Sequence, residues 1–262
     1  MIRKAILVVS FGTSHNDTRK NTIEQIENEI QQEFPDYAIY RAFTSKMIIK
    51  ILRNRDGIHV CTVTEAMEQM FQDGVEEVIV QPTHILNGIE NDNMIYDVNL
   101  YKEKFASILL GAPLLNETED YWKVIDAFVK KVPNLDRKDA IVCMGHGTEH
   151  YTNSSYAALD YMFKSVGYHN IYVATVEAYP SLGDIIEKLK ENNKSRIVLI
   201  PFMIVAGEHA KNDMAGDEED SWKVILDHEG FEVTCILEGL GENAEIRRIF
   251  IEHIHAAVAS NA

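Results

Sequence analysis

The chain has 262 residues, 46% of them hydrophobic and 25% charged, and its 25 basic and 41 acidic side chains give a formal net charge of −16. This length allows one large domain or two of ordinary size, and the composition is that of a globular protein. The negative charge argues against nucleic acid or an anionic membrane as a partner, because both require a basic surface.

The cytoplasm is the expected location. No apolar stretch reaches the roughly 18 residues of a membrane span, and the N-terminal apolar run is too short for a signal peptide. Cys61, Cys143 and Cys235 are far apart in the sequence and form no CxxC pair. We therefore expect three reduced thiols and no thiolate zinc site.

Eight short runs rich in Ile, Val and Leu predict strands. Such runs, apolar at successive positions, are typical of a parallel sheet that is covered by helices on both faces. In chain order they span residues 5–12, 38–45, 76–86, 105–115, 139–147, 170–177, 196–207 and 231–240.

Helical periodicity separates these runs. Apolar residues recur at helical spacing over residues 23–34, after a capping pair at Asn16 and Asp17, and over residues 156–163, before Gly167. A last helix is expected over residues 242–258. The alternation of strands and helices predicts an α/β fold.

An internal repeat divides the chain. Residues 5–15 match residues 140–150, residues 41–45 match 177–181, and residues 78–90 match 197–209, in the same order. We interpret this as two similar α/β domains, residues 1–125 and 126–241, each with a four-stranded parallel sheet flanked by helices. The terminal segment 242–262 lies outside the repeat and could pack on the first domain.

The two copies differ where a site is expected. Ligands of open α/β sheets bind beyond the carboxyl ends of the strands. At three matched strand ends the second copy carries His146, Glu177 and His209, and the first copy carries Phe11, Arg41 and Glu90. Two imidazoles and a carboxylate can hold a divalent metal ion or accept protons near neutral pH.

Other readings of these residues are weaker. A histidine phosphatase needs an Arg before His146, where Gly145 stands, and the GxGxxG and GxSxG motifs of dinucleotide binding and acyl hydrolysis are missing. His84 is expected to be a satisfied core histidine. His15 and His150 share a repeat position, which favours a scaffold role, and the acidic residues 217–220 are expected to form a solvated loop.

The sequence resembles the CbiK-type anaerobic cobaltochelatases of cobalamin biosynthesis, in the class II chelatase family. The motifs that carry the resemblance are VSFGTS (9–14), RAFTS (41–45), MGHG (144–147), VEAYP (176–180), VAGEHAKNDM (205–214), DSW (220–222) and GLGEN (239–243). The resemblance implies two α/β domains with an active site in the cleft between them. It also implies ATP-independent insertion of Co²⁺ into sirohydrochlorin, without an organic cofactor.

The resemblance places metal binding at His146, Glu177 and His209, with His146 as the proton acceptor and Glu177 compensating charge. Substrate contacts are expected from Ser10, Phe11, Arg41 and Glu90, and the basic residues Arg41, Lys46, Arg53 and Arg55 are candidates for binding substrate carboxylates. The alternatives are a ferro- or nickel-chelatase and a tetrapyrrole or metal carrier without turnover. The sequence leaves the oligomeric state open, with a homo-oligomer among the options.

Overall fold

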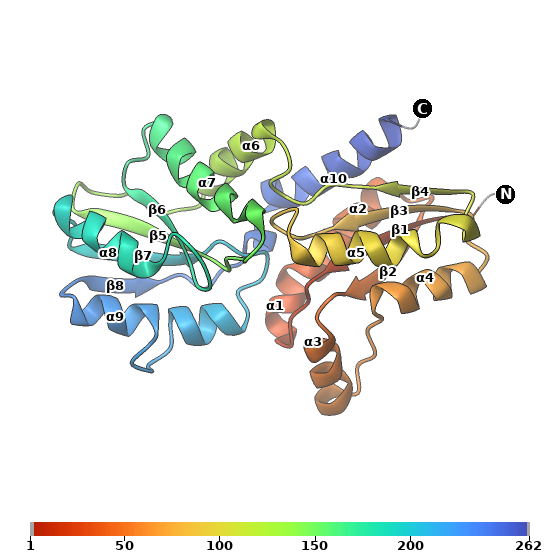
Figure 1. Ribbon diagram of the computed structural model, residues 1–262, viewed down its shortest axis with the longest axis horizontal. Coiled ribbons are helices and arrows are strands. Elements are labelled where there is room, and N and C mark those ends of the chain that lie inside the picture. The colour runs from red at the N-terminus through yellow and green to blue at the C-terminus, as the bar shows by residue number, and fades with distance from the viewer. Residues whose placement is uncertain (1–2, 261–262) are drawn as a thin grey trace.

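The computed structural model describes residues 3–260 and consists of two lobes, each built on a four-stranded parallel sheet (Figure 1). The predicted fold class is confirmed, and the eight predicted runs all contain strands. The strand orders are β2-β1-β3-β4 and β6-β5-β7-β8, so the two sheets share one topology. The strands are β1 (Lys4–Ser10), β2 (Ala38–Phe43), β3 (Glu77–Pro82), β4 (Ser107–Leu110), β5 (Asp139–Gly145), β6 (Ile171–Thr175), β7 (Arg196–Pro201) and β8 (Glu232–Cys235).

Helices connect the strands and cover the sheets (Figure 1). The α-helices are α1 (Asn16–Asn21), α2 (Ile23–Glu33), α3 (Lys46–Ile51), α4 (Val63–Gln72), α5 (Ile89–Asn99), α6 (Thr118–Val129), α7 (Ser154–Ser165), α8 (Leu182–Glu191), α9 (Trp222–His228) and α10 (Ala244–Ala259). Short turns of 3₁₀ or π geometry are η1 (Leu52–Asp56), η2 (Lys102–Lys104), η3 (Tyr151–Asn153), η4 (His209–Met214) and η5 (Leu240–Glu242). No helix within residues 3–260 has the length and apolar character to cross a membrane.

The central strands are apolar at successive positions because both faces of each sheet are buried. In β1, Ile6 and Val8 join one hydrophobic cluster, and Leu7 and Val9 join another on the opposite face. The alternation follows from strand geometry, which points successive side chains to opposite faces. The same alternation in β5 places Ile141 in the first of these clusters.

One hydrophobic cluster joins the two lobes. It contains Ile6 of β1, Ile141 of β5, Phe128 of α6 and Phe250 of α10. Helix α10 contacts α2, β3 and β4 of the first lobe as well as α6, and α6 also contacts α7 of the second. The division expected between residues 125 and 126 falls inside α6. As a proposal, we place the boundary in the segment 130–138 that follows this helix.

The first predicted helix is divided in two. The structure forms α1 and α2 with a break at Thr22, whose backbone lies outside the helical region at φ −123° and ψ −81°. The prediction that Asn16 and Asp17 cap this helix is wrong, because α1 starts at Asn16. The residue before it, His15, makes no side-chain capping bond. This break places His15 and α1 at the junction of the lobes.

A buried ion pair fixes α10 to α6. His253 Nε2 lies 3.0 Å from Asp120 Oδ1, and His253 Nδ1 lies 3.0 Å from the carbonyl oxygen of Ala112. The backbone N–H groups of Asn116 and Glu117 donate to the other oxygen of Asp120. Burial alone would raise the pKa of Asp120, but the hydrogen bonds from His253 and from the backbone outweigh burial and hold this pKa below 3.8.

We expect Asp120→Asn to lower the free energy of unfolding by about 1–3 kcal/mol at pH 7, because His253 loses its charged partner. A carboxyl group whose pKa is lowered by folding stabilises the protein above its unfolded pKa, and this stabilisation disappears as the pH falls through the folded pKa. The difference between wild type and variant should therefore shrink below about pH 4. Denaturant unfolding at several pH values measures this difference in the free energy of unfolding. A difference independent of pH would contradict the assigned role of the Asp120 carboxylate.

Candidate metal centre

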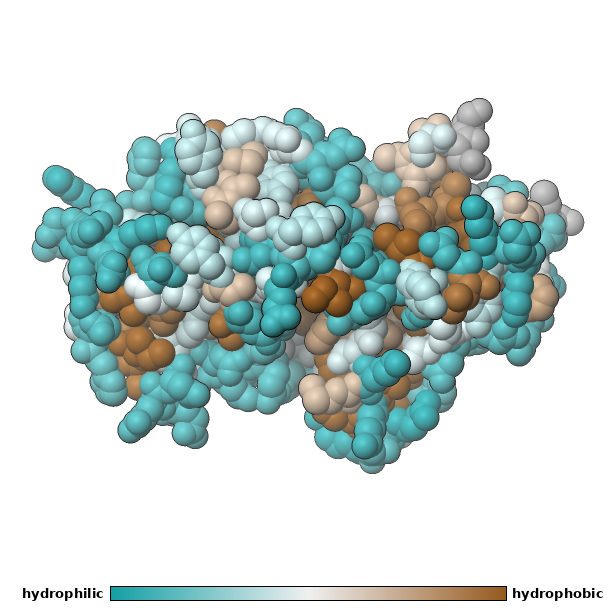
Figure 2. All heavy atoms as spheres, viewed as in Figure 1, coloured by the Kyte–Doolittle hydropathy of each residue, from teal (hydrophilic) through white to brown (hydrophobic). Residues whose placement is uncertain are grey.

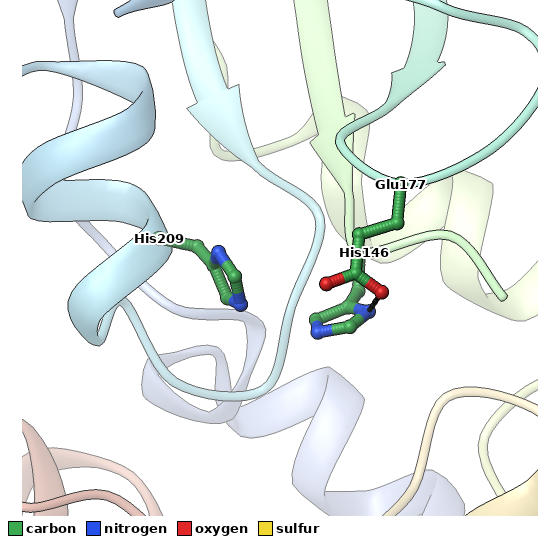
Figure 3. A group of neighbouring side chains, drawn as sticks. All are labelled: His146, Glu177 and His209. Atoms are coloured by element: carbon green, nitrogen blue, oxygen red, sulfur yellow. Dashed lines mark ion pairs between the residues drawn. The ribbon is translucent and has the colours of Figure 1, made fainter.

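His146, Glu177 and His209 converge at the carboxyl ends of the second sheet (Figure 3). His146 follows β5, Glu177 lies in the loop after β6, and His209 opens the turn η4 after β7. One ligand atom from each residue lies within 4.8 Å of the ligand atoms of the other two, and within residues 3–260 these three form the one such cluster of His, Cys, Asp and Glu. Their side chains are 40%, 54% and 34% exposed, so a substrate can reach them.

Two glycines make room for His146. A Cβ atom at Gly145 would lie 2.4 Å from the ring of Tyr156, and a Cβ at Gly147 would lie 2.9 Å from the backbone nitrogen of Ala178. Gly147 also has a φ of +86°, which side chains other than glycine rarely adopt. Packing thus favours glycine on both sides of His146, and an arginine in place of Gly145 would require the buried Tyr156 ring to move.

Backbone hydrogen bonds hold Glu177 beside His146. The N–H of Glu177 donates to the carbonyl oxygen of His146 at 3.0 Å, and the N–H of Val176 donates to that of Gly145 at 3.0 Å. These bonds continue the pairing of β5 with β6 beyond the strand ends. They fix the two residues within one rigid part of the second lobe.

The hydrogen bonds of His146 leave one ring nitrogen free. Its Nδ1 lies 2.9 Å from the carbonyl oxygen of Gly147, which can only accept, so Nδ1 carries the proton and Nε2 keeps a lone pair. Glu177 Oε2 lies 3.6 Å from the same Nδ1. The ring centroids of His146 and His209 are 4.7 Å apart at 90°. A metal ion or a pyrrole proton can therefore be bound at Nε2.

Asp213 orients His209 and was missed by the sequence reasoning. Its carboxylate accepts from His209 Nδ1 at 2.5 Å, one turn further along the same segment. A carboxylate on one ring nitrogen fixes the tautomer and leaves the other nitrogen as a metal ligand. The signal in the sequence was the His-x-x-x-Asp spacing within VAGEHAKNDM.

The first lobe presents Phe11 to the centre. The Phe11 ring is 43% exposed, although it is large and apolar, and its centroid lies 6.5 Å from that of His146. Ser10, the residue before it, is buried, and its hydroxyl oxygen accepts from Thr83 at 2.8 Å. Phe11 can therefore contact a ligand at the centre, whereas the buried Ser10 stabilises the loop that carries Phe11.

Arg41 is occupied elsewhere. Its Nε donates to Glu27 Oε1 at 2.6 Å, a second nitrogen pairs with the other oxygen of Glu27, and Glu24 lies 3.8 Å away. The prediction that Arg41 contacts the substrate does not fit this arrangement, because the bidentate pair with Glu27 on α2 already occupies the guanidinium. Glu90 lies in the first turn of α5 and is half-buried, apart from the three clustered residues.

Most of the other basic candidates are also engaged. Arg55 pairs with Asp56 and donates to the carbonyl oxygen of Ser14, and Arg53 bonds His59 at 3.1 Å. Lys46 is exposed at the start of α3. Lys46 is therefore the candidate of this group that best fits a role in binding an anionic substrate.

The remaining expectations have mixed outcomes. Among the described residues, neither ring nitrogen of His84 has a hydrogen-bond partner, so the prediction of a satisfied core histidine is wrong. Burial lowers the pKa of His84 to about 4. In the acidic loop, Asp217 is solvated as expected and pairs with Lys223.

Solved structures share this architecture. SirB from Bacillus subtilis with Fe³⁺ is 12% identical in sequence, with a TM-score of 0.68 and coverage of 99% of this chain and 97% of SirB. CbiX, described as the terminal enzyme for biosynthesis of siroheme in denitrifying bacteria, is 13% identical, with a TM-score of 0.59 and coverage of 97% and 99%. The protein thus has the two-lobed fold of the chelatase class.

The sequence comparisons narrow this class to one family. The model of the family described as cobalt chelatase (CbiK) matches residues 4–259, and the chain belongs to this family. The sirohydrochlorin cobaltochelatase of Salmonella typhimurium is 40% identical over 257 residues, which are 98% of this chain and 97% of the relative. The sirohydrochlorin cobaltochelatase CbiKC of Nitratidesulfovibrio vulgaris is 30% identical over 266 aligned residues, 99% of this chain and 92% of the relative.

Proposed function

We propose that the chain inserts Co²⁺ into sirohydrochlorin, without ATP or an organic cofactor, at the centre formed by His146, Glu177 and His209. The membership of the CbiK family and the activity named for its two relatives support the reaction. The observation that carries the site assignment is the convergence of three ligand atoms within 4.8 Å at the exposed ends of the second sheet. Co²⁺ is a substrate here, and the site must bind it and also release it.

The donor set suits transient binding. Two neutral imidazoles and one carboxylate can hold a divalent cobalt ion while leaving coordination positions open for the nitrogens of the macrocycle. Asp213 keeps His209 in the tautomer that binds metal through Nε2. Glu177 contributes a negative charge beside the dication.

Insertion also releases two protons. The macrocycle loses two pyrrole N–H protons as it gains Co²⁺, so the net charge of the complex is unchanged. When the metal moves to the macrocycle, His146 Nε2 becomes free and can take the first proton. Glu177, 3.6 Å from Nδ1, stabilises the resulting imidazolium. The imidazolium then gives the proton at Nε2 to water, which restores the Nε2 lone pair for the second pyrrole proton.

The first lobe supplies the opposite wall. We propose that Phe11 packs on one face of the macrocycle, with the metal centre approaching from the second lobe. Figure 2 shows that the outline of the molecule is notched between the two lobes. Of the remaining predicted contacts, Glu90 stays a candidate for the substrate periphery, with Ser10 as support for the Phe11 loop.

The metal preference is tested by comparing initial rates of insertion of Co²⁺, Fe²⁺ and Ni²⁺ into sirohydrochlorin under anaerobic conditions. His and carboxylate ligands suit all three ions, so the ligand types alone do not select among them. We expect insertion of Co²⁺ to be the fastest. A faster reaction with Fe²⁺ or Ni²⁺ would contradict the assignment as a cobaltochelatase and would indicate a ferro- or nickel-chelatase that uses the same site.

We also propose that the protein acts in the cytoplasm. Cys61, Cys143 and Cys235 are free thiols, and burial raises the pKa of each. Such thiols are typical of a reducing compartment.

A further inference from the structure

The segment that carries His209 touches the first lobe at several points. His15 Nε2 lies 3.1 Å from Glu208 Oε2, and Lys211 Nζ lies 3.5 Å from Asp17 Oδ2. In addition, the Thr18 hydroxyl lies 3.4 Å from the carbonyl oxygen of Ala206, within hydrogen-bonding distance. Residues on both sides of His209 are thus held by the loop and helix at residues 13–21 of the other lobe, seen in Figure 1 where α1 faces the second lobe.

The positions of His146 and Glu177 are set by bonds within the second lobe. His146 and Glu177 are joined by backbone bonds within the second lobe. The second lobe anchors the His209 turn through Ala210 and Met214, which are buried in its core. The exposed side of that turn faces the first lobe. A shift of the lobes would therefore move His209 relative to His146 and Glu177.

We propose that residues 13–18 of the first lobe position His209, so that the fit between the lobes sets the affinity for Co²⁺. His15 and Asp17 are positioning residues in this arrangement, since they contact Glu208 and Lys211 rather than the metal. This inference rests on the proposed metal centre. This arrangement would also allow the site to release Co²⁺ to the macrocycle. Separation of the lobes would loosen His209, while His146 and Glu177 stay in place.

The internal repeat supplies a matched control. His150, the repeat counterpart of His15, makes the reciprocal contact across the lobes, with Nε2 at 3.4 Å from Asp92 Oδ2 of α5. This pair also joins the lobes, but neither of its members contacts the segment 206–211. Loss of this pair weakens the junction of the lobes without releasing the His209 turn.

The test measures the Kd for Co²⁺ in the full-length protein without sirohydrochlorin, by anaerobic titration of the Co²⁺ absorption bands. We expect the double variant His15→Gln, Asp17→Asn to bind Co²⁺ about threefold to tenfold more weakly, in keeping with the loss of two partly exposed polar contacts. The control His150→Gln, Asp92→Asn should stay within about twofold of wild type. In a protein that keeps Asp17, His15→Lys places a donor opposite Glu208 and should bind Co²⁺ nearly as tightly as wild type.

Two outcomes would overturn the inference. One is an unchanged Kd in the His15, Asp17 variant, and the other is an equal loss in the control, which would indicate a general loosening of the lobes. Thermal unfolding of each variant separates these results from loss of structure. His209→Ala, measured in the same titration, tests the metal centre itself: if it also leaves the Kd unchanged, the proposed centre is wrong, and if it alone weakens binding, only the positioning role is wrong.

Discussion

Substitution of His146 by Ala is expected to lower the rate of Co²⁺ insertion into sirohydrochlorin by at least about a hundredfold. In the proposed mechanism the side chain supplies both a ring nitrogen for the metal and the acceptor for the two pyrrole protons. General base catalysis alone contributes about 10² to 10⁴ in rate. Its imidazole is 40% exposed, so its removal leaves no buried cavity. The fold of the variant should therefore be preserved.

The assay is the anaerobic change in absorbance of sirohydrochlorin on metal insertion. His169→Ala is the matched control, because His169 is an exposed histidine of the same lobe outside the metal centre, and its rate should equal that of wild type. A His146→Ala protein with more than about a tenth of the wild-type rate would remove His146 from the role of proton acceptor.

The second large effect is expected on metal binding. His209→Ala should raise the Kd for Co²⁺ about a hundredfold, because it removes one of the three proposed protein ligands, while Asp213→Asn should raise it about tenfold. The smaller change follows from geometry: the amide of Asn can still bond Nδ1, but it no longer favours the tautomer with a free Nε2. Anaerobic titration with Co²⁺ in the absence of sirohydrochlorin measures both.

The order of these two effects is informative. Equal losses in both variants would mean that the carboxylate of Asp213 itself binds the metal. Unchanged affinity in His209→Ala would exclude this residue from the centre, whatever its effect on turnover.

The repeat in the sequence predicted the residues that the structure brings together. His146 and His209 are 63 residues apart, yet comparison of the two copies placed them, with Glu177, at equivalent strand ends of one sheet. The strands themselves were predictable because both faces of β1 and β5 are buried, which requires apolar residues at successive positions. The fold class could therefore be predicted from the apolar runs of the strands and the helical periodicity between them.

Contacts between distant elements could not be predicted in this way. Arg41 stands at the repeat position of Glu177, but the placement of α2 over β2 gives it Glu27 as a partner. His84 lies in the loop that follows β3, and the sequence does not reveal that its ring nitrogens lack partners there among the described residues. The contact of His15 with Glu208 depends on how the lobes meet, which no local pattern encodes.

The difference between the two copies of the repeat indicates that the two lobes have different roles. The second lobe carries the proposed metal ligands at its strand ends, and the first lobe carries Phe11 at the equivalent position and a loop that touches the His209 segment. In the proposed mechanism one lobe performs the chemistry and the other shapes the site around it.

The most direct test of the central proposal is a single-turnover reaction of the wild-type protein with sirohydrochlorin and Co²⁺ under anaerobic conditions, with absorbance and proton release recorded together. The proposal predicts rapid spectral conversion and the release of two protons for each Co²⁺ inserted. A bound but unchanged spectrum with Co²⁺, Fe²⁺ and Ni²⁺ alike, without proton release, would contradict it and would indicate a carrier.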